Sequence, residues 1–412
     1  MASEPMAPGP MLDVDQARQR ILGAAHPVGV EAVELADALG RVPATRAYVA
    51  QTDVPPFANS SMDGFAVRTA DLPGPLPISG EAAAGGGPAT VLAPGTAVRI
   101  MTGAPLPAGA DAVVPVEETE EADGAVTISG AVELGANVRG AGHDTRAGET
   151  VCLPGVLGPA AIAILASLGL ATFEVRRRPR VVILATGDEL VSPGQPLQPG
   201  QIYDANSFGL SAAVQEAGAE PIRLPRAADD EAALQELVVR GAGAGDLLVV
   251  SGGVSVGRRD YLRPVLERIG RLSFWRIAVQ PGKPLAFGDV GGTPVIGLPG
   301  NPVSALVTFE LFVRPLIRAM LGRSGDGRGH QQALLTEPMD KDPDRQAYLR
   351  VVLSRQGEDW RARPAGGQAS SQLRSLAAAN GLLTIPRGLA RAAAGERYDA
   401  IILDPTSVEV GG

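Results

Sequence analysis

The segment SGGVSVGRRD, residues 251–260, places a glycine-rich turn beside two arginines and an acid, a composition that could serve several chemistries. From Gly252 onward it approaches the G-x-x-x-x-G pattern of a P-loop. That loop requires a lysine for the phosphates and a hydroxyl for Mg²⁺, whereas Arg258 and Arg259 occupy these positions. The sequence therefore disfavours a P-loop.

From Gly253 onward the same segment matches G-x-S-x-G, the nucleophile elbow of hydrolases, with Ser255 as the nucleophile. An apolar strand precedes it and a helix follows, as the elbow requires. The mechanism also needs a downstream histidine to take the proton, and the one candidate, His330, lies in the glycine-rich linker 322–330. A serine hydrolase is therefore disfavoured as well.

A third interpretation assigns the segment to anion binding without a nucleophile. Gly252, Gly253, Ser255 and Gly257 would form a turn that directs backbone N–H groups, at the start of a helix, toward a phosphate. A glycine-rich turn that binds nothing is the alternative for any such loop taken alone. The acids of the neighbouring loops favour the ligand-binding interpretation.

Those acids each follow a predicted strand: Glu189 follows the first strand, Asp229 the second and Asp260 the third. Taken singly, each could be a cap or first-turn acid of the next helix. Together, beside a phosphate-binding turn, they predict a Mg²⁺ site that bridges carboxylates to a polyphosphate, because bare carboxylates would repel such a substrate. Lys283 in QPGKP would supply positive charge.

The elements that position these residues follow Arg180, where apolar strands alternate with helical segments several times. This order predicts right-handed crossovers and a doubly wound, mostly parallel sheet over residues 179–325. Ligands bind at the carboxyl ends of such strands, where all of these loops begin. In GLPGNPVSA, Asn301 can cap the last helix and Pro302 can begin it.

Three further domains complete the predicted α/β multidomain architecture. Short apolar runs cut by glycine and proline predict an inserted β domain over residues 51–144. Helical segments on both sides of it predict a discontinuous N-terminal helical and mixed domain, residues 11–50 plus 145–178. Short strands after the linker predict a C-terminal β-barrel-like domain, residues 326–412. The uncharged run 151–173 is broken by glycine and proline in its first half, so we expect a short buried core helix rather than a membrane span.

Composition narrows the function classes. The chain of 412 residues has a net charge of −9, which argues against nucleic-acid binding. Its single cysteine, Cys152, excludes an internal disulfide, and its three histidines, His26, His143 and His330, lack the spacing of a zinc site. We expect a cytoplasmic protein with no membrane segment.

Seven motifs occur in one order along the chain: DVPPFANSSMDGFAV, RIMTGAPLPAGADAVV, LATGDEL, GQIYDAN, SGGVSVGRRDY, QPGKP and GLPGNPVSA. In that order they resemble the molybdopterin molybdenumtransferases, the MoeA-type family to which the E domain of gephyrin belongs. The resemblance implies a homodimeric enzyme that takes adenylylated molybdopterin and molybdate and, with Mg²⁺, releases AMP and molybdenum cofactor. The partners it implies are molybdopterin adenylyltransferase and the molybdoenzymes, or their chaperones, that receive the product.

The resemblance also assigns residues. Asp63 of SMDG and Thr102 of MTGA match catalytic positions that would face the partner subunit's cleft, and Asp144 of GHDT matches an active-site acid. The remaining catalytic acids, which are also the predicted metal ligands, are Glu189, Asp229 and Asp260. The predicted substrate-binding residues are Gly252, Gly253, Ser255, Gly257, Lys283, Pro299, Pro302 and Ser371. In QASSQLRSLAAAN, which holds Ser371, the alternative is Ser370.

Two positions depart from the family pattern. His143 stands where the motif often has glutamate, and Gln280 stands where many relatives have a lysine, which leaves Lys283 as the sole cation of that turn. A glutamine amide can still donate to an anion. Two other functions stay open: adenylylation of molybdopterin, whose enzyme resembles the doubly wound domain alone, and a non-catalytic scaffold role. The flanking β domains disfavour the first, and the lack of a second module disfavours the other.

Overall fold

The computed structural model describes residues 11–85, 91–254 and 261–411. The chain forms two compact units. The first combines Met1–Gly29 with Arg176–Gly412, and the second is Val30–Val175. The second unit is thus an insertion between two parts of the first.

The first unit contains a six-stranded mixed sheet. Its strands, in spatial order, are β16 (Glu220–Arg223), β13 (Arg180–Ala185), β17 (Leu247–Ser251), β21 (Thr293–Leu298), β20 (Pro284–Val290) and β18 (Arg271–Arg276). Neighbours from β16 to β21 run parallel, whereas β20 and β18 are antiparallel additions at one edge. All five residues of β17 are buried, as expected for a central parallel strand with both faces covered. The predicted mostly parallel sheet is confirmed.

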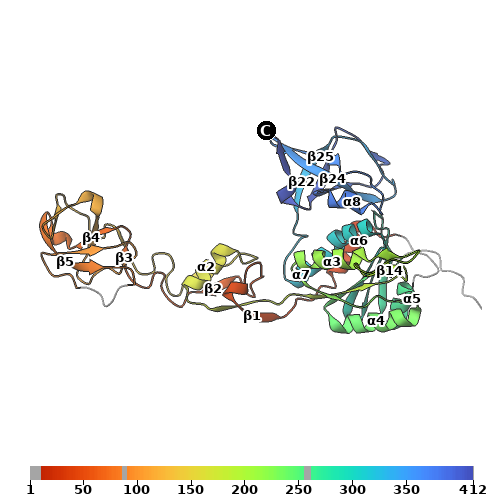
Figure 1. Ribbon diagram of the computed structural model, residues 1–412, viewed down its shortest axis with the longest axis horizontal. Coiled ribbons are helices and arrows are strands. Elements are labelled where there is room, and N and C mark those ends of the chain that lie inside the picture. Colours follow the sequence, from red (N-terminus) through yellow and green to blue (C-terminus); the bar gives the residue numbers. More distant parts are fainter. Residues whose placement is uncertain (1–10, 86–90, 255–260, 412) are drawn as a thin grey trace, which may run out of the picture. The chain divides into compact units, whose positions relative to one another are not determined.

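Helices cover both faces of this sheet (Figure 1). On one face lie α3 (Ala205–Glu216), α6 (Pro302–Thr308) and α7 (Arg314–Met320), the last two joined by a π-helical turn, Phe309–Val313. On the other face, α4 (Glu231–Ala244) and α5 (Leu262–Ile269) pack on strand residues Val182, Leu184, Leu248 and Val250. This two-sided cover is the doubly wound arrangement, and it leaves the strand ends free to form a site.

Helix α1 (Val14–Leu22) begins at Asp13, whose carboxylate accepts from the Gln16 amide at 2.7 Å. Its buried face, which includes Ala17 and Ile21, contacts α7. The sequence predicts this helix as part of the discontinuous N-terminal domain, residues 11–50 plus 145–178, whereas its contacts place it in the first unit. The reason is that the apolar face of α1 packs against α7. The other predicted domain boundaries stay a prediction.

A closed barrel forms the C-terminal part of the first unit. Its five strands, in spatial order, are β24 (Gln346–Gln356), β25 (Asp359–Pro364), β22 (Gly329–Leu335), β28 (Arg397–Ile402) and β26 (Gly381–Ile385), and β26 pairs back with β24. Two short strands, β19 (Val279–Gln280) and β29 (Glu409–Gly411), add to β24. The predicted barrel-like domain is therefore confirmed, and β19 connects it to the loop that carries Lys283.

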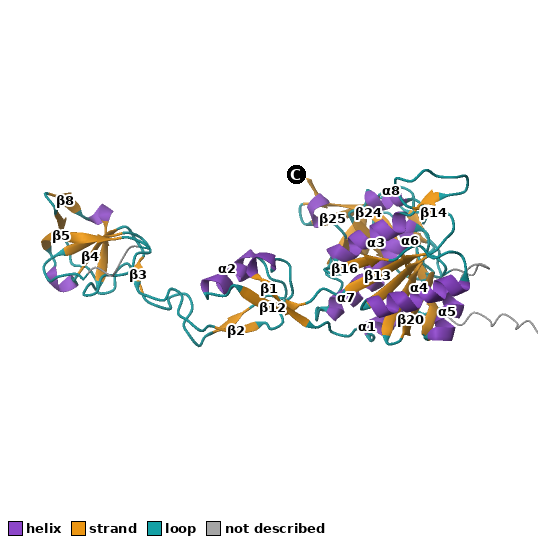
Figure 2. Cartoon of the chain, turned by 60° about the horizontal axis from the view of Figure 1, so that its bottom comes forward, coloured by secondary structure: helices purple, strands orange, loops and turns teal. Residues whose placement is uncertain are grey.

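The second unit contains a six-stranded sheet (Figure 2). Its strands, in spatial order, are β7 (Ala112–Pro115), β4 (Gly64–Val67), β6 (Ala97–Ile100), β5 (Gly74–Ala82), β9 (Ala125–Ile128) and β8 (Glu120–Ala122). Successive residues of β4 alternate between two cores: Phe65 and Val67 belong to one and Ala66 to the other. The predicted β-rich insertion is thus a sheet with apolar packing on both faces.

The rest of the second unit is built on small strand pairs and one helix. The pairs join β1 (Val30–Glu34) with β12 (Thr172–Arg176), β2 (Ala47–Val49) with β11 (Thr150–Cys152), and β3 (Asn59–Ser60) with β10 (Val138–Arg139). The uncharged run 151–173 supplies α2 (Pro159–Ser167), which buries one face through Ala161 and Leu165 and exposes the other. It is therefore a surface helix with one face in a core cluster rather than the buried core helix expected from its composition. In the described ranges, every helix is too short or too polar to cross a bilayer.

Candidate functional site

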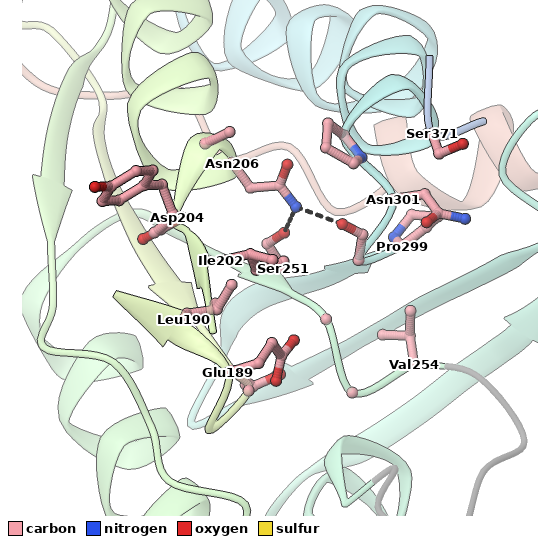
Figure 3. Close-up of a pocket in the computed structure, with 18 of the residues that line it drawn as sticks. Glu189, Leu190, Ile202, Asp204, Asn206, Ser251, Val254, Pro299, Asn301 and Ser371 are labelled. Atoms are coloured by element: carbon pink, nitrogen blue, oxygen red, sulfur yellow. Dashed lines mark hydrogen bonds between the residues drawn. The ribbon is translucent and has the colours of Figure 1, made fainter. Parts of the chain in front are cut away.

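The carboxyl ends of four parallel strands surround a cleft of about 600 Å³ (Figure 3). The chain leaves β13 toward β16 on one side and then crosses back to β17 on the other, which makes the β13–β17 boundary the topological switch point of the sheet. The two strands pair in parallel, and Ala185 lies opposite Ser251 at their carboxyl ends. Loops that follow β13, β16, β17 and β21 line the cleft, and Ser371 from the C-terminal part completes it.

The turn after β17 fits tightly against the turn after β13. The Thr186 amide donates to the Ser251 carbonyl at 3.0 Å, and Gly252 donates to the Leu298 carbonyl at 3.1 Å. Gly252 has φ +95°, and a Cβ there would lie 2.7 Å from Thr186 Oγ1. Glycine is therefore required at this position by both backbone conformation and space.

The turn that carries Glu189 is held by Arg226. The guanidinium donates to the Gly187 carbonyl at 2.7 Å and to Asp188 Oδ1 at 3.2 Å. Glu189 is exposed and lines the cleft, and its carboxylate has no hydrogen-bond or ion-pair partner within the described part of the chain. Asp188 is thus a structural acid, whereas Glu189 is available to a cation or a ligand.

Two acids follow β16, and they differ in role. Asp230 caps α4 by accepting from the Ala233 amide at 2.8 Å, which is the structural alternative foreseen for such acids. Asp229 lines the cleft together with Glu189. The third predicted metal ligand, Asp260, lies outside the described residues, as do Ser255 and Gly257. Within the ranges that the structure describes, no group of three acid, histidine or cysteine side chains gathers at one point.

Asn206 is a cleft residue that the sequence analysis did not identify, although it lies in the quoted motif GQIYDAN. It follows Asp204, whose carboxylate caps α3 by accepting from the Ser207 amide at 2.9 Å. The Asn206 Nδ2 donates to Ser251 Oγ and to the Gly300 carbonyl, both at 2.8 Å (Figure 3). Its motif begins a helix just after a short strand, Ile202–Tyr203, but no local spacing indicates the two distant contacts that Asn206 makes.

Ser371 reaches the cleft on a loop that a buried arginine holds in place. Arg350 is fully buried, and its guanidinium donates to the Gly367 carbonyl at 2.9 Å, the Ala369 carbonyl at 3.2 Å and Ser375 Oγ at 2.9 Å. Burial lowers the pKa of Arg350. The neighbouring Ser370 accepts from Asn301 Nδ2 at 2.9 Å, so Ser371 is the serine of this pair that lines the cleft. No sequence pattern indicates that Arg350 holds this loop.

Asn301 therefore does not cap α6 with its side chain as the sequence analysis expects. It occupies the N-cap position without a side-chain cap bond, and Pro302 begins the helix as predicted. The amide is used instead to join the loop after β21 to Ser370. Pro299 and Pro302 both line the cleft, one on each side of this residue.

The QPGKP turn contacts the barrel. Gln280 Oε1 accepts from the Asp342 amide at 2.8 Å, and Val279 pairs with Gln346. Lys283 is exposed and immediately precedes Pro284, which lines the cleft. Gln280 thus serves as an acceptor that connects the turn to the barrel.

The remaining predicted site residues lie in the second unit. Asp63 Oδ1 accepts from the Thr102 amide at 2.6 Å and from the Thr102 hydroxyl at 2.8 Å. These two bonds, the amide first, hold the pKa of the Asp63 carboxyl below its ordinary value. Antiparallel pairing of β4 with β6 brings the two residues together, because Gly64 lies opposite Ile100. Asp144 accepts from the Thr145 hydroxyl at 3.2 Å.

Comparisons with known proteins agree along the chain. Three family profiles match: the MoeA N-terminal region (domain I and II) over residues 12–169, a probable molybdopterin binding domain over residues 182–319, and the MoeA C-terminal region (domain IV) over residues 332–403. The second match contains the strands and loops of the cleft.

Whole-chain relatives give the same result. Molybdopterin molybdenumtransferase 2 of Mycobacterium tuberculosis is 42% identical over 361 residues, 84% of this chain and 89% of that protein. Molybdopterin molybdenumtransferase of Haemophilus influenzae is 38% identical over 394 residues, 94% of this chain and 97% of that protein. The crystal structure of the MoeA protein from Pyrococcus horikosii superposes with a TM-score of 0.83 at 34% identity, covering 96% of this chain and all of that one. The chain therefore belongs to the MoeA family of molybdopterin molybdenumtransferases, transferases of molybdenum cofactor biosynthesis.

Proposed function

We propose that this chain inserts molybdenum from molybdate into adenylylated molybdopterin and releases AMP and molybdenum cofactor. The observation that carries the proposal is the cleft at the switch point, within the matched molybdopterin binding domain. It combines a glycine turn whose backbone a phosphate can approach, the Glu189 carboxylate, which has no partner among the described residues, and Ser371 from the barrel. Family membership supports the reaction class, and homodimerisation in the cytoplasm is part of the same proposal.

Mg²⁺ fits the residues of this cleft. In sites that handle phosphates, Mg²⁺ is held by one or two carboxylates plus the substrate oxygens rather than by a complete protein cage. Glu189 and Asp229 line the cleft and offer such hard oxygen ligands. When bound, the ion would supply charge neutralisation at the pyrophosphate between AMP and the pterin phosphate. Glu189, Asp229 and Asp260 are the residues proposed to hold it.

The protein's own groups have binding and orienting roles in this proposal. Gly252 and Gly253, with Ser255 and Gly257, let the backbone approach the phosphates, and Pro299 and Pro302 fix the facing turn. Molybdate, a tetrahedral dianion, would be held by hydroxyl and cationic groups, for which Ser371 and Lys283 are proposed. Asp63, Thr102 and Asp144 are proposed catalytic residues on the strength of their motifs. None of these roles requires a covalent protein nucleophile.

The test is the Mg²⁺ dependence of AMP release from adenylylated molybdopterin in the presence of molybdate. Glu189→Gln removes one ligand charge, and Glu236→Gln removes an exposed acid on α4 as a matched control. We expect the Mg²⁺ concentration for half-maximal release to rise roughly tenfold or more in Glu189→Gln and to stay unchanged in Glu236→Gln. Equal Mg²⁺ dependence in the two variants would remove Glu189 from the metal site.

A further inference from the structure

Asn206 connects three loops of the cleft. It lies in the first turn of α3, and both protons of its amide are used, one by Ser251 Oγ and one by the Gly300 carbonyl, each at 2.8 Å (Figure 3). Because a carbonyl oxygen can only accept, the Gly300 contact fixes which side of the amide carries Nδ2. The amide therefore holds the ends of β17 and β21 to the start of α3.

The same contact determines where the Ser251 hydroxyl can donate. A hydroxyl oxygen that accepts from Nδ2 must direct its own proton elsewhere. Ser251 is 2% exposed, and none of the described residues accepts that proton. Since Ser251 lines the cleft, the proton is available to an acceptor atom of a ligand there.

The other side of the Asn206 amide has an unsatisfied atom. Its Oδ1 is buried and has no donor within the described ranges. A buried carbonyl oxygen without a partner is destabilising, and such groups in folded proteins call for a functional reason. Turning the amide over would expose Oδ1 to the Gly300 carbonyl, another acceptor, so the observed orientation serves the two contacts that shape the cleft.

We propose that Asn206 is a positioning residue that presents the Ser251 hydroxyl proton to a phosphate oxygen of the nucleotide held in the cleft. The identity of that ligand, a nucleotide, rests on the proposed function, whereas the hydrogen bonds of Asn206 come from the structure. A hydroxyl that already accepts a hydrogen bond is a better donor, and a donor to a charged oxygen forms the stronger class of hydrogen bond. The adjoining Gly252 has no side chain that would keep a phosphate away.

A double-mutant cycle on AMP binding tests this inference, with calorimetry on the full-length protein. The variants are Asn206→Ala, Ser251→Ala and the two combined, and the control is Ser211→Ala, which removes an α3 hydroxyl that bonds the Ser207 carbonyl. We expect Kd for AMP to rise roughly tenfold in each single variant and by no more than that in the double variant, because both changes remove one interaction. Ser211→Ala should bind as wild type does.

Turnover gives a second readout. With adenylylated molybdopterin, Asn206→Ala and Ser251→Ala should raise KM and leave kcat unchanged, the pattern for a contact made equally in ground and transition states. The inference is overturned if Ser251→Ala binds AMP as tightly as wild type, if the two losses multiply to roughly a hundredfold, or if wild type does not bind AMP. Should Asn206→Ala fail to fold, Ser251→Ala decides alone. If the Kd values for AMP follow this pattern but the wild type releases no AMP from adenylylated molybdopterin, the inference stands and only the proposed function is contradicted.

Discussion

At the residue scale, Asp63 offers a direct check on the second unit. Because the Thr102 amide and hydroxyl both donate to its carboxylate, its pKa lies below the ordinary value of 3.8. We expect NMR titration of the Asp63 carboxyl carbon to give a pKa below that value. Thr102→Val, which removes the hydroxyl and keeps the amide, should return the pKa part of the way. An Asp63 pKa at or above the ordinary value would contradict the observed contacts.

Gly187 gives a second residue-scale prediction. It has φ +135°, and a Cβ there would lie 2.6 Å from the Glu189 carboxylate oxygens. Gly187→Ala should destabilise the protein by about 1–3 kcal/mol and weaken Mg²⁺ binding by displacing Glu189. The matched control is Gly194→Ala, which has φ +90° and open space around it. Urea unfolding and Mg²⁺ titration together check this: equal Mg²⁺ affinity in both variants would show that Glu189 does not hold the ion.

Sequence patterns predict the residues whose roles depend on a strand end and miss those whose roles depend on distant contacts. Glu189, Asp229 and the Gly252 turn lie in the loops that follow parallel strands, so the sheet topology brings them to one edge. Asn206 instead acquires its role from contacts with residues 45 and 94 positions away. Arg350 likewise contacts a loop 17 to 25 positions later. No local spacing encodes such pairs.

At the element scale, four charged side chains join the linker after α7 to α3 and to the π-helical turn. Arg328 donates to Glu310 at 2.9 and 3.0 Å and to Glu216 at 2.8 Å, and its side chain is 11% exposed. Arg314 bonds the same two acids. The network thus fixes the chain immediately before the first barrel strand, β22.

Arg328→Met should therefore destabilise the first unit by about 3 kcal/mol, because it leaves the largely buried Glu310 carboxylate, together with the exposed Glu216, with Arg314 as the remaining cation of this network. The control is Arg397→Met, which removes an exposed pair with Asp359 and should cost less than about 1 kcal/mol. Chemical denaturation measures both. Similar losses in the two variants would mean that the network contributes no more than a surface ion pair.

The sequence predicts an element correctly where the periodicity and the length of its apolar pattern indicate the same type of element. The parallel strands and the barrel are confirmed, whereas β20 and β18 have no counterpart in the sequence analysis. Five of the seven β20 residues are buried without polar alternation, and the strand begins at Pro284 of a glycine–proline turn, so its pattern does not distinguish a strand from a buried loop. The one-sided burial of α2 is likewise set by its partners rather than by its uniformly apolar composition.

At the scale of the whole molecule, acid should destabilise the first unit. Burial opposes ionisation of Glu216 and Asp246, but hydrogen bonds and charges from arginines outweigh it and lower both pKa values from 4.5 and 3.8. These groups bind fewer protons when folded, so their contribution is present above the unfolded values and is lost as pH falls through the folded ones.

Urea unfolding at several pH values checks this. The free energy of unfolding should decrease as pH falls from about 5 to 3, and Asp246→Asn, which cannot ionise, should show a shallower decrease over the same range. An equal slope in Asp246→Asn and wild type would show that Asp246 does not contribute to the acid sensitivity.

The measurement that tests the central claim most directly is AMP release from adenylylated molybdopterin by the purified full-length protein, with and without molybdate. The account predicts that AMP appears only when molybdate and Mg²⁺ are both present, and that the pterin product activates a molybdenum-free molybdoenzyme. AMP release at the same rate without molybdate, or consumption of ATP with molybdopterin in place of AMP release, would contradict it, the second result by pointing to the adenylylation reaction.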